Sequence, residues 1–241
     1  MNMIIAATSD IHSPRHFDMF VKSMEELQAK PDLFLLAGDI VRRGNADEYL
    51  KVYNVFFGKI NCPIVACFGN DEFGPEPRVL IENRVPDIKF VNDESIIIDA
   101  KDKKIGIVGS LGCLDRPTYW QRTNIPSIYE TYRERAETIE KILNELKTDV
   151  KILLIHYAPT YKILGGEDPK TYAELGCNRL EKVMVEQKPD LVITGHSHKG
   201  TKRAWVDTVP IFNVALVLNQ TIVVIDTEKD LKPGLEKFLE E

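Results

Sequence analysis

The residues best suited to chemistry are two carboxylates, one amide and four histidines, each placed after a short apolar run. The set is Asp10, His12, Asp39, Asn70, His156, His196 and His198. Four of the five histidines in the chain share this placement. Mixed nitrogen and oxygen donors suit Mn, Zn, Fe or Ni better than Ca or Mg. Seven donors exceed the needs of one tetrahedral ion, which favours two divalent ions that share a bridging carboxylate.

These side chains must be positioned by the strands that the apolar runs predict. The runs that lead into them are Ile4 to Thr8, Leu33 to Ala37, Ile64 to Phe68, Ile152 to Ile155 and Leu191 to Thr194. Helical patterns lie between the runs, at Phe17 to Lys30, Asp47 to Ile60, Ile128 to Lys147 and Leu175 to Gln187. The alternation predicts an α/β fold with parallel strands, whose carboxyl ends share one rim where ligands bind.

Further strands are expected in the middle and in the last third of the chain. Residues 96–108 are predicted to form a hairpin with a charged turn at Asp99 to Lys103. The later runs are Thr201 to Val206, Pro210 to Val214, Ala215 to Leu218 and Thr221 to Ile225. So many strands favour two packed sheets over one. Leu111 to Ser127 is predicted to be a loop, and Lys229 to Glu241 a short charged helix.

The order of the polar motifs resembles that of a known family. The blocks are Asp10-Ile11-His12, Gly38-Asp39, Gly69-Asn70, His156 and Gly195-His196-Ser197-His198. Together they resemble the calcineurin-like metallophosphoesterases, in particular the small single-domain bacterial and archaeal type. The resemblance implies a four-layer αββα sandwich, in which two packed mixed β-sheets are flanked by helices, and one domain over residues 1–241.

The resemblance also implies a role for each residue of the set. One ion would be held by Asp10, His12 and His198. The other would be held by Asn70, His156 and His196, with Asp39 bridging both. Two such ions lower the pKa of a shared water, so that a bridging hydroxide attacks the phosphorus of a phosphodiester or phosphomonoester. The alternatives are a single-strand nuclease and a non-catalytic metal-binding scaffold of the same fold.

One block departs from the family pattern. The family commonly has Gly-Asn-His followed by an acidic residue, and its histidine contacts the phosphate. Here the block is Gly69-Asn70-Asp71-Glu72. Asp71 could act as a general acid if its pKa were raised, or it could only orient neighbouring groups through hydrogen bonds. The sequence leaves both roles open.

Candidate substrate contacts lie beside the motifs. Arg15 and His16 follow the first block and could line the pocket, or serve as surface and helix-cap residues. Tyr119 and Trp120 could stack on an aromatic group of the substrate, or pack as a lid or against a second subunit in a homodimer. Arg42 and Arg43 could meet a phosphate, or form an exposed loop pair.

Composition restricts the partners. The 241 residues are 44% hydrophobic and carry a net charge of -6, so no strong nucleic-acid signal is present. The four cysteines form no C-x-x-C pair and are expected to be buried. No apolar run approaches the length of a membrane span, and the N-terminal run indicates a strand rather than a signal peptide. We therefore expect a cytoplasmic protein that acts on a small phosphoester.

Overall fold

The computed structural model describes residues 3–232 and contains two mixed β-sheets that pack face to face. The first sheet has the strand order β11-β1-β2-β3-β4. Its strands are β1 Ile4–Thr8, β2 Leu33–Ala37, β3 Ile64–Cys67, β4 Lys89–Phe90 and β11 Val223–Asp226. Strands β1 to β4 are parallel, and β11 pairs antiparallel with β1.

The second sheet has the strand order β5-β6-β7-β8-β10-β9. Its strands are β5 Glu94–Ala100, β6 Lys103–Ser110, β7 Val150–Ile155, β8 Leu191–Thr194, β9 Arg203–Val206 and β10 Val209–Asn213. The central strands β6, β7, β8 and β10 are parallel, whereas β5 and β9 close the two edges in the antiparallel sense. The expected hairpin is therefore confirmed as β5 and β6.

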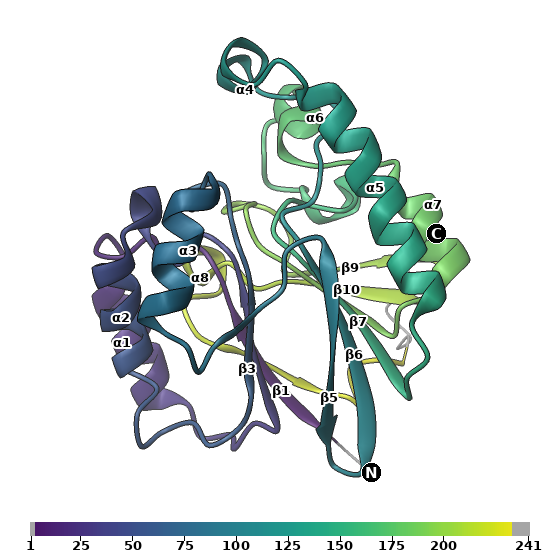
Figure 1. The fold of residues 1–241 in the computed structure, drawn as a ribbon. Coiled ribbons are helices and arrows are strands. Elements are labelled where there is room, and N and C mark those ends of the chain that lie inside the picture. The colour runs from purple at the N-terminus through teal and green to yellow at the C-terminus, as the bar shows by residue number, and fades with distance from the viewer. Residues whose placement is uncertain (1–2, 233–241) are drawn as a thin grey trace.

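Helices cover the outer face of each sheet (Figure 1). The first sheet carries α1 Phe17–Glu26, α2 Ala46–Asn54 and α3 Pro75–Arg84. The second carries α5 Ile128–Glu145 and α7 Leu180–Gln187. The shorter helices are α4 Tyr119–Asn124, α6 Tyr172–Leu175 and α8 Leu216–Asn219. The order of layers is helix, sheet, sheet, helix, which confirms the predicted αββα sandwich.

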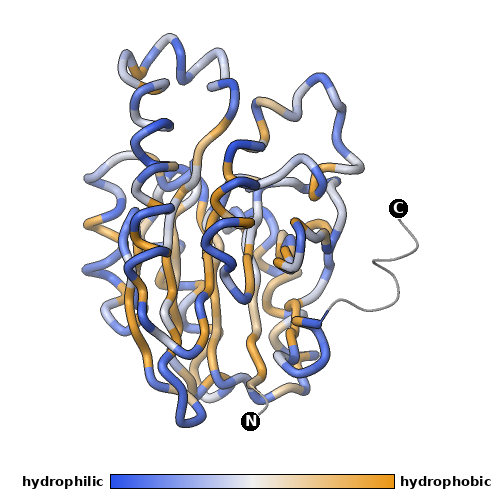
Figure 2. The backbone as a smooth tube through the Cα atoms, turned by 90° about the vertical axis from the view of Figure 1, so that its right-hand side faces the viewer, coloured by the Kyte–Doolittle hydropathy of each residue, from blue (hydrophilic) through white to orange (hydrophobic). Residues whose placement is uncertain are grey.

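Both faces of each sheet are buried. The strand side chains therefore form three apolar layers, one between the two sheets and one beneath the helices on each outer face. In β2, Phe34 and Leu36 pack toward the helices, while Leu33 and Leu35 join the core between the sheets. Ile152 and Leu154 of β7 meet that same central core. The apolar strands accordingly run through the middle of the molecule, with hydrophilic turns at their ends (Figure 2).

Several sequence predictions need correction. Ala215 to Leu218 is not a strand, because Asn213 and Asn219 form hydrogen bonds to the backbone at Ala215 and the chain turns into α8. The predicted loop from 111 to 127 contains α4. Helix α3 was not predicted, although it begins with Pro75 at a position that suits proline.

Two helix predictions change at their ends. The helix expected from Leu175 begins at Leu180, because residues 172–175 form the separate helix α6. Of the helix expected over Lys229 to Glu241, residues 229–232 are turns and bends, and the remainder lies outside the described residues.

Candidate metal centre and adjoining cavity

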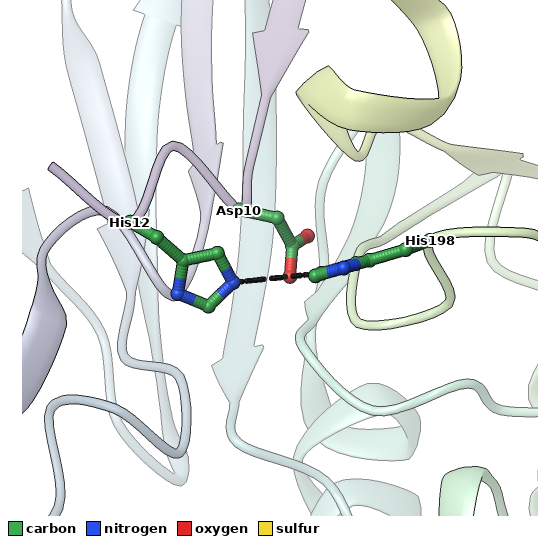
Figure 3. A group of neighbouring side chains, drawn as sticks. All are labelled: Asp10, His12 and His198. Atoms are coloured by element: carbon green, nitrogen blue, oxygen red, sulfur yellow. Dashed lines mark hydrogen bonds and ion pairs between the residues drawn. The ribbon is translucent and has the colours of Figure 1, made fainter. Parts of the chain in front are cut away.

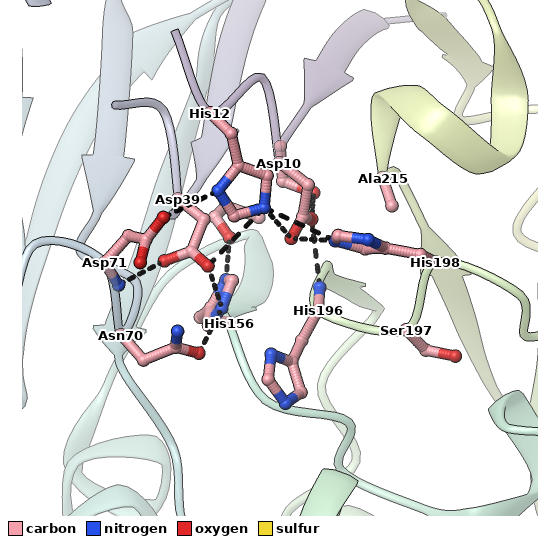
Figure 4. A network of polar contacts seen from close by, with 12 residues as sticks. Asp10, His12, Asp39, Asn70, Asp71, His156, His196, Ser197, His198 and Ala215 are labelled. Atoms are coloured by element: carbon pink, nitrogen blue, oxygen red, sulfur yellow. Dashed lines mark hydrogen bonds and ion pairs between the residues drawn. The ribbon is translucent and has the colours of Figure 1, made fainter. Parts of the chain in front are cut away.

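The seven candidate residues meet at the carboxyl ends of strands from both sheets. Strands β1, β2 and β3 lead to Asp10, His12, Asp39 and Asn70. Strands β7 and β8 lead to His156, His196 and His198. Their side chains converge where the two sheets adjoin (Figure 4). We call this set the rim residues.

Sharp backbone turns aim these side chains. Asp10, His12, Asp39 and His196 have φ angles of 56°, 46°, 51° and 66°. Such left-handed conformations are unfavourable for residues other than glycine and are concentrated at functional sites. Gly38 also has a positive φ, and a Cβ there would lie 2.6 Å from the Gly69 nitrogen. Four of the seven rim residues therefore depend on backbone geometry that the surrounding fold must enforce.

The first group of donors contains Asp10, His12 and His198 (Figure 3). Asp10 Oδ1 lies 3.0 Å from His198 Nε2 and 3.7 Å from His12 Nε2. The other Asp10 oxygen accepts hydrogen bonds from Ser9 Oγ at 2.5 Å and from the His196 backbone nitrogen at 2.9 Å. One oxygen is thus held by the fold, while the other faces the two imidazoles.

The second group contains Asp39, His156 and His196, with Asn70 beside it. His156 Nε2 lies 3.5 Å from Asp39 Oδ2 and 3.2 Å from Asn70 Oδ1. Asp39 Oδ2 is also 3.8 Å from His12 Nε2 in the first group. The Asp39 carboxylate therefore lies between the two groups of donors.

Hydrogen bonds fix which nitrogen each of two histidines presents. His156 Nδ1 donates to the Ala37 carbonyl oxygen at 2.8 Å, which leaves Nε2 facing Asp39. His12 Nδ1 lies 2.8 Å from Asp71 Oδ2, which leaves Nε2 facing Asp10. Histidines that bind metals are usually oriented by such a carbonyl or carboxylate. Asp71 thus orients His12 in this structure, and its backbone nitrogen donates to Asp39 Oδ1 at 2.7 Å.

Glu72 organises the same turns, a role that was not predicted from the sequence. Its buried carboxylate accepts hydrogen bonds from the backbone nitrogens of Asp39, Ile40, Val41 and Gly69 at 2.6 to 3.0 Å. Burial and the Asp39 charge raise the pKa of Glu72 to about 7. In the sequence, the only indication of this role was that Glu72 is the acidic residue at the end of the third block.

The electrostatics favour bound cations. Burial raises the pKa of Asp10 and Asp39, but hydrogen bonds and charges from the nearby histidines outweigh it and hold both pKa values below their usual range. Burial lowers the pKa of His156, yet the Asp39 and Asp10 charges raise it to about 10. Burial and the His156 charge lower the pKa of His196 to about 3. The buried carboxylates thus hold a positive charge on His156, which a bound cation would replace, while His196 keeps an unprotonated nitrogen.

The donor set fits divalent metal ions by a second criterion. Asp10 and Asp39 are 0% and 2% exposed, and within residues 3–232 their ion pairs are to histidines rather than to lysine or arginine. Buried carboxylates need a compensating positive charge. Nitrogen and oxygen donors that gather around such carboxylates can hold ions of the Mn, Zn, Fe or Ni kind.

A cavity of about 730 Å³ adjoins the rim, and Asn70, Asp71 and His196 form part of its wall. Trp120 also lines this cavity, whereas Tyr119 does not and is 77% exposed. Arg15 and His16 do not line the cavity either. Arg15 is exposed, and His16 lies with its ring centre 6.5 Å from that of His12. The structure therefore separates the four substrate candidates and brings only Trp120 to the cavity.

The cavity also contains residues that sequence reasoning did not single out. Phe73, Arg78, Gln121 and Arg135 belong to its wall. They come from separate segments of the chain, so their spacing in the sequence gave no signal. Of the predicted arginine pair, Arg43 lines the cavity and Arg42 does not.

Comparison with known proteins identifies the class. The family model "Calcineurin-like phosphoesterase" matches residues 3–200, and the chain belongs to this family. The chain is therefore a hydrolase of phosphoric ester bonds, from a family that uses divalent metal ions. A protein of Arcobacter nitrofigilis, named as a probable glycerophosphodiester phosphodiesterase GpdQ, is 23% identical over 210 residues, which cover 87% of this chain and 71% of the relative.

Solved structures support the fold. One superposes with a TM-score of 0.66 at 15% identity and covers 95% of this chain and 97% of its own. The protein TT1561 of Thermus thermophilus has a TM-score of 0.58 at 15% identity, with coverage of 94% and 100%. Among the described residues, no helix is both long enough and apolar enough to cross a membrane.

Proposed function

We propose that this chain is a phosphodiesterase that works with two divalent ions bound by the rim residues. One observation carries the proposal: Asp39 Oδ2 lies 3.8 Å from His12 Nε2 and 3.5 Å from His156 Nε2, between two separate groups of donors. Asp10, His12 and His198 would hold one ion. Asn70, His156 and His196 would hold the other, and Asp39 would bridge them.

The chemistry of such a pair is known in general terms. When bound, two divalent ions supply a hydroxide from water near neutral pH and stabilise the charge on the phosphate oxygens. The protein holds the ligands in position. Ala37 and Asp71 orient two imidazoles, and Glu72 fixes the turns that carry Asp39 and Asn70.

A diester is favoured over a monoester because of Asp71. Its carboxylate stands 2.8 Å from His12, where the family commonly has a histidine that contacts phosphate. A monoester carries close to two negative charges at neutral pH, so an added carboxylate disfavours it more than a singly charged diester. The name of the Arcobacter nitrofigilis relative, a glycerophosphodiester phosphodiesterase, points the same way.

The alternative functions have less support. A single-strand nuclease needs a basic groove, yet Arg78 and Arg135 in the cavity wall are already hydrogen-bonded within the protein. A non-catalytic scaffold would have lost ligands, whereas all seven rim residues gather here. A cytoplasmic location and a homodimer stay predictions. Light scattering in solution decides the second.

The test is metal-dependent turnover. Protein stripped with a chelator should hydrolyse neither bis(p-nitrophenyl) phosphate nor a glycerophosphodiester, and Mn, Zn, Fe(II) or Ni should restore activity. With the best metal, kcat/KM for the p-nitrophenyl diester should exceed that for p-nitrophenyl phosphate. Full activity after stripping would contradict the metal requirement, and a strong preference for the monoester would contradict the diester assignment.

A further inference from the structure

The cavity beside the rim has no role in the hydrolysis described above. Its volume of about 730 Å³ far exceeds what a phosphate group needs and lies in the range of pockets for organic ligands. Leu111, Leu114, Ile125 and Ile128 contribute aliphatic surface to its wall. Because Asn70 and His196 belong both to the rim and to the cavity wall, a group attached to a phosphate at the rim can extend into the cavity.

Most charged residues of the wall are already satisfied by the protein. Arg135 forms two hydrogen bonds to Asp93, at 2.9 and 3.0 Å, and one to the Gly112 carbonyl at 2.9 Å. Arg78 donates to the Glu72 carbonyl and to Asn92. These guanidinium groups are therefore committed to internal partners.

The acidic residue Glu174 is similarly occupied, because it pairs with Arg116 at 3.1 Å and Arg122 at 3.7 Å. Arg43 differs, since it is exposed and follows Asp39 by four residues. A ligand in the cavity interior consequently meets mainly aliphatic and aromatic surface.

Two aromatic residues from opposite sides of the site meet at this cavity. Phe73 follows the third rim block, and Trp120 lies on α4. Their ring centres are 5.5 Å apart at an interplanar angle of 88°. Both side chains are about half exposed, at 50% and 53%. An edge-to-face pair of this geometry is favourable, and its exposed ring surface is available to an apolar ligand.

The helix that carries Trp120 is firmly fixed. Thr118 and Gln121 form a reciprocal capping box at its start. The Gln121 side chain also donates to the Tyr157 hydroxyl at 3.1 Å, which ties α4 to the strand end that carries His156. Trp120 is thus a positioned wall residue rather than a free surface side chain.

We propose that this cavity binds an apolar ester group, aromatic or aliphatic, of the phosphodiester substrate. The proposal rests on the proposed function, because the phosphate must sit at the rim for the ester group to enter the cavity. The substrate class is then a phosphodiester with one bulky apolar substituent. Discrimination between a large and a small substituent would come from the surface that the Phe73 and Trp120 rings and the aliphatic wall bury.

Two phosphonate monoesters that differ in one substituent test this directly. Methyl phenylphosphonate and methyl methylphosphonate present the same charged oxygens, but only the first carries a bulky apolar group. Calorimetric titration of the metal-loaded protein should give a dissociation constant roughly 10- to 100-fold lower for the phenyl compound. Equal constants, or binding of neither compound, would overturn the proposal.

Two variants localise the effect. Trp120→Ala removes part of the wall, and Thr131→Trp fills the cavity from α5, so each should reduce the ratio of the two dissociation constants to within about threefold. Tyr129→Ala is the control. Tyr129 lies on α5, the helix of Thr131, is 58% exposed and does not line the cavity. A ratio that both cavity variants leave unchanged would place the selective surface elsewhere.

Failure of the cavity proposal and failure of the proposed function give different results. If bis(p-nitrophenyl) phosphate is hydrolysed with metal but both phosphonates bind equally, only the cavity proposal is wrong. If no phosphoester is hydrolysed with any metal while the phenyl compound still binds preferentially, the proposed function fails, and the cavity is an apolar binding site without a role in substrate choice.

Discussion

The rim and the adjoining cavity are built in different ways. At the rim, Asp10, Asp39 and His156 are at most 2% exposed. Ser9 and Asp71 donate hydrogen bonds to the two carboxylates, and His156 donates to the Ala37 carbonyl. At the cavity, Phe73 and Trp120 are half exposed and are held mainly by contact with each other and by the helix that carries Trp120. Substitutions at the rim should therefore disturb the fold, whereas substitutions of the exposed cavity residues should cost little stability.

This difference suggests that the rim and the cavity have separate roles, one in hydrolysis and the other in substrate preference. If the rim binds the phosphate of every ester, as we propose, a change there should affect all substrates equally. Only a bulky ester group reaches the cavity wall, so a change there should alter the preference among substrates. Substitutions on the two sides should therefore have effects that differ in kind as well as in size.

The largest effect is expected for Asp39→Asn. The amide removes the negative charge between the two donor groups, so kcat/KM should fall at least about 1,000-fold for every ester, large or small. Asp99→Asn is the control. Asp99 is exposed in β5 and pairs with Lys104 at the start of β6, which is the end of the sheet away from the rim. Hydrolysis assays with one bulky and one small diester measure both. A loss confined to one of the two esters would contradict these separate roles.

A smaller effect is expected for Asp71→Asn, which weakens the group that orients His12. Loss of such a partner typically costs 10- to 100-fold in metal affinity. Activity at low metal concentration should fall by roughly this factor, and excess metal should restore most of it. Titration of activity against metal concentration gives the result.

The same variant distinguishes the two roles that the sequence left open for Asp71. If Asp71 is the general acid, excess metal should not rescue the variant. The loss should then be much greater for a diester with a poor leaving group than for a p-nitrophenyl ester.

The smallest effect is expected for Phe73→Ala. An edge-to-face aromatic contact contributes about 0.5–1.5 kcal/mol, so the preference for a phenyl over a methyl substituent should fall roughly two- to 12-fold. Competition of the two phosphonates against a chromogenic diester provides the measurement. Equal losses for both compounds would mean that Phe73 belongs with the rim and not with a selective wall.

The rim could be predicted from the sequence because each of its residues follows a strand that is apolar on both faces. The strands β1, β2 and β8 have the predicted bounds, and β7 begins two residues earlier than predicted. A strand end is a local feature, and parallel strands bring such ends together. The role of Glu72 was not predicted, because its carboxylate accepts hydrogen bonds from backbone nitrogens more than 30 residues away in the sequence.

The cavity could not be predicted for a related reason. Its wall combines Arg43, Phe73, Trp120, Arg135 and Glu174, which share no sequence period and meet only after both sheets have packed. The pair Tyr119 and Trp120 was visible as a candidate, but the sequence could not say which ring turns inward. The start of α4, set by the capping box of Thr118 and Gln121, decides this, and this six-residue helix was not predicted.

The central claim is that the rim holds two divalent ions. Its most direct test is elemental analysis of protein reconstituted with Mn or Zn and freed of excess metal, with Asp39→Asn in parallel. We predict close to two ions per chain for the native sequence and fewer for the variant. One ion or none per native chain, together with full phosphodiesterase activity, would contradict the account.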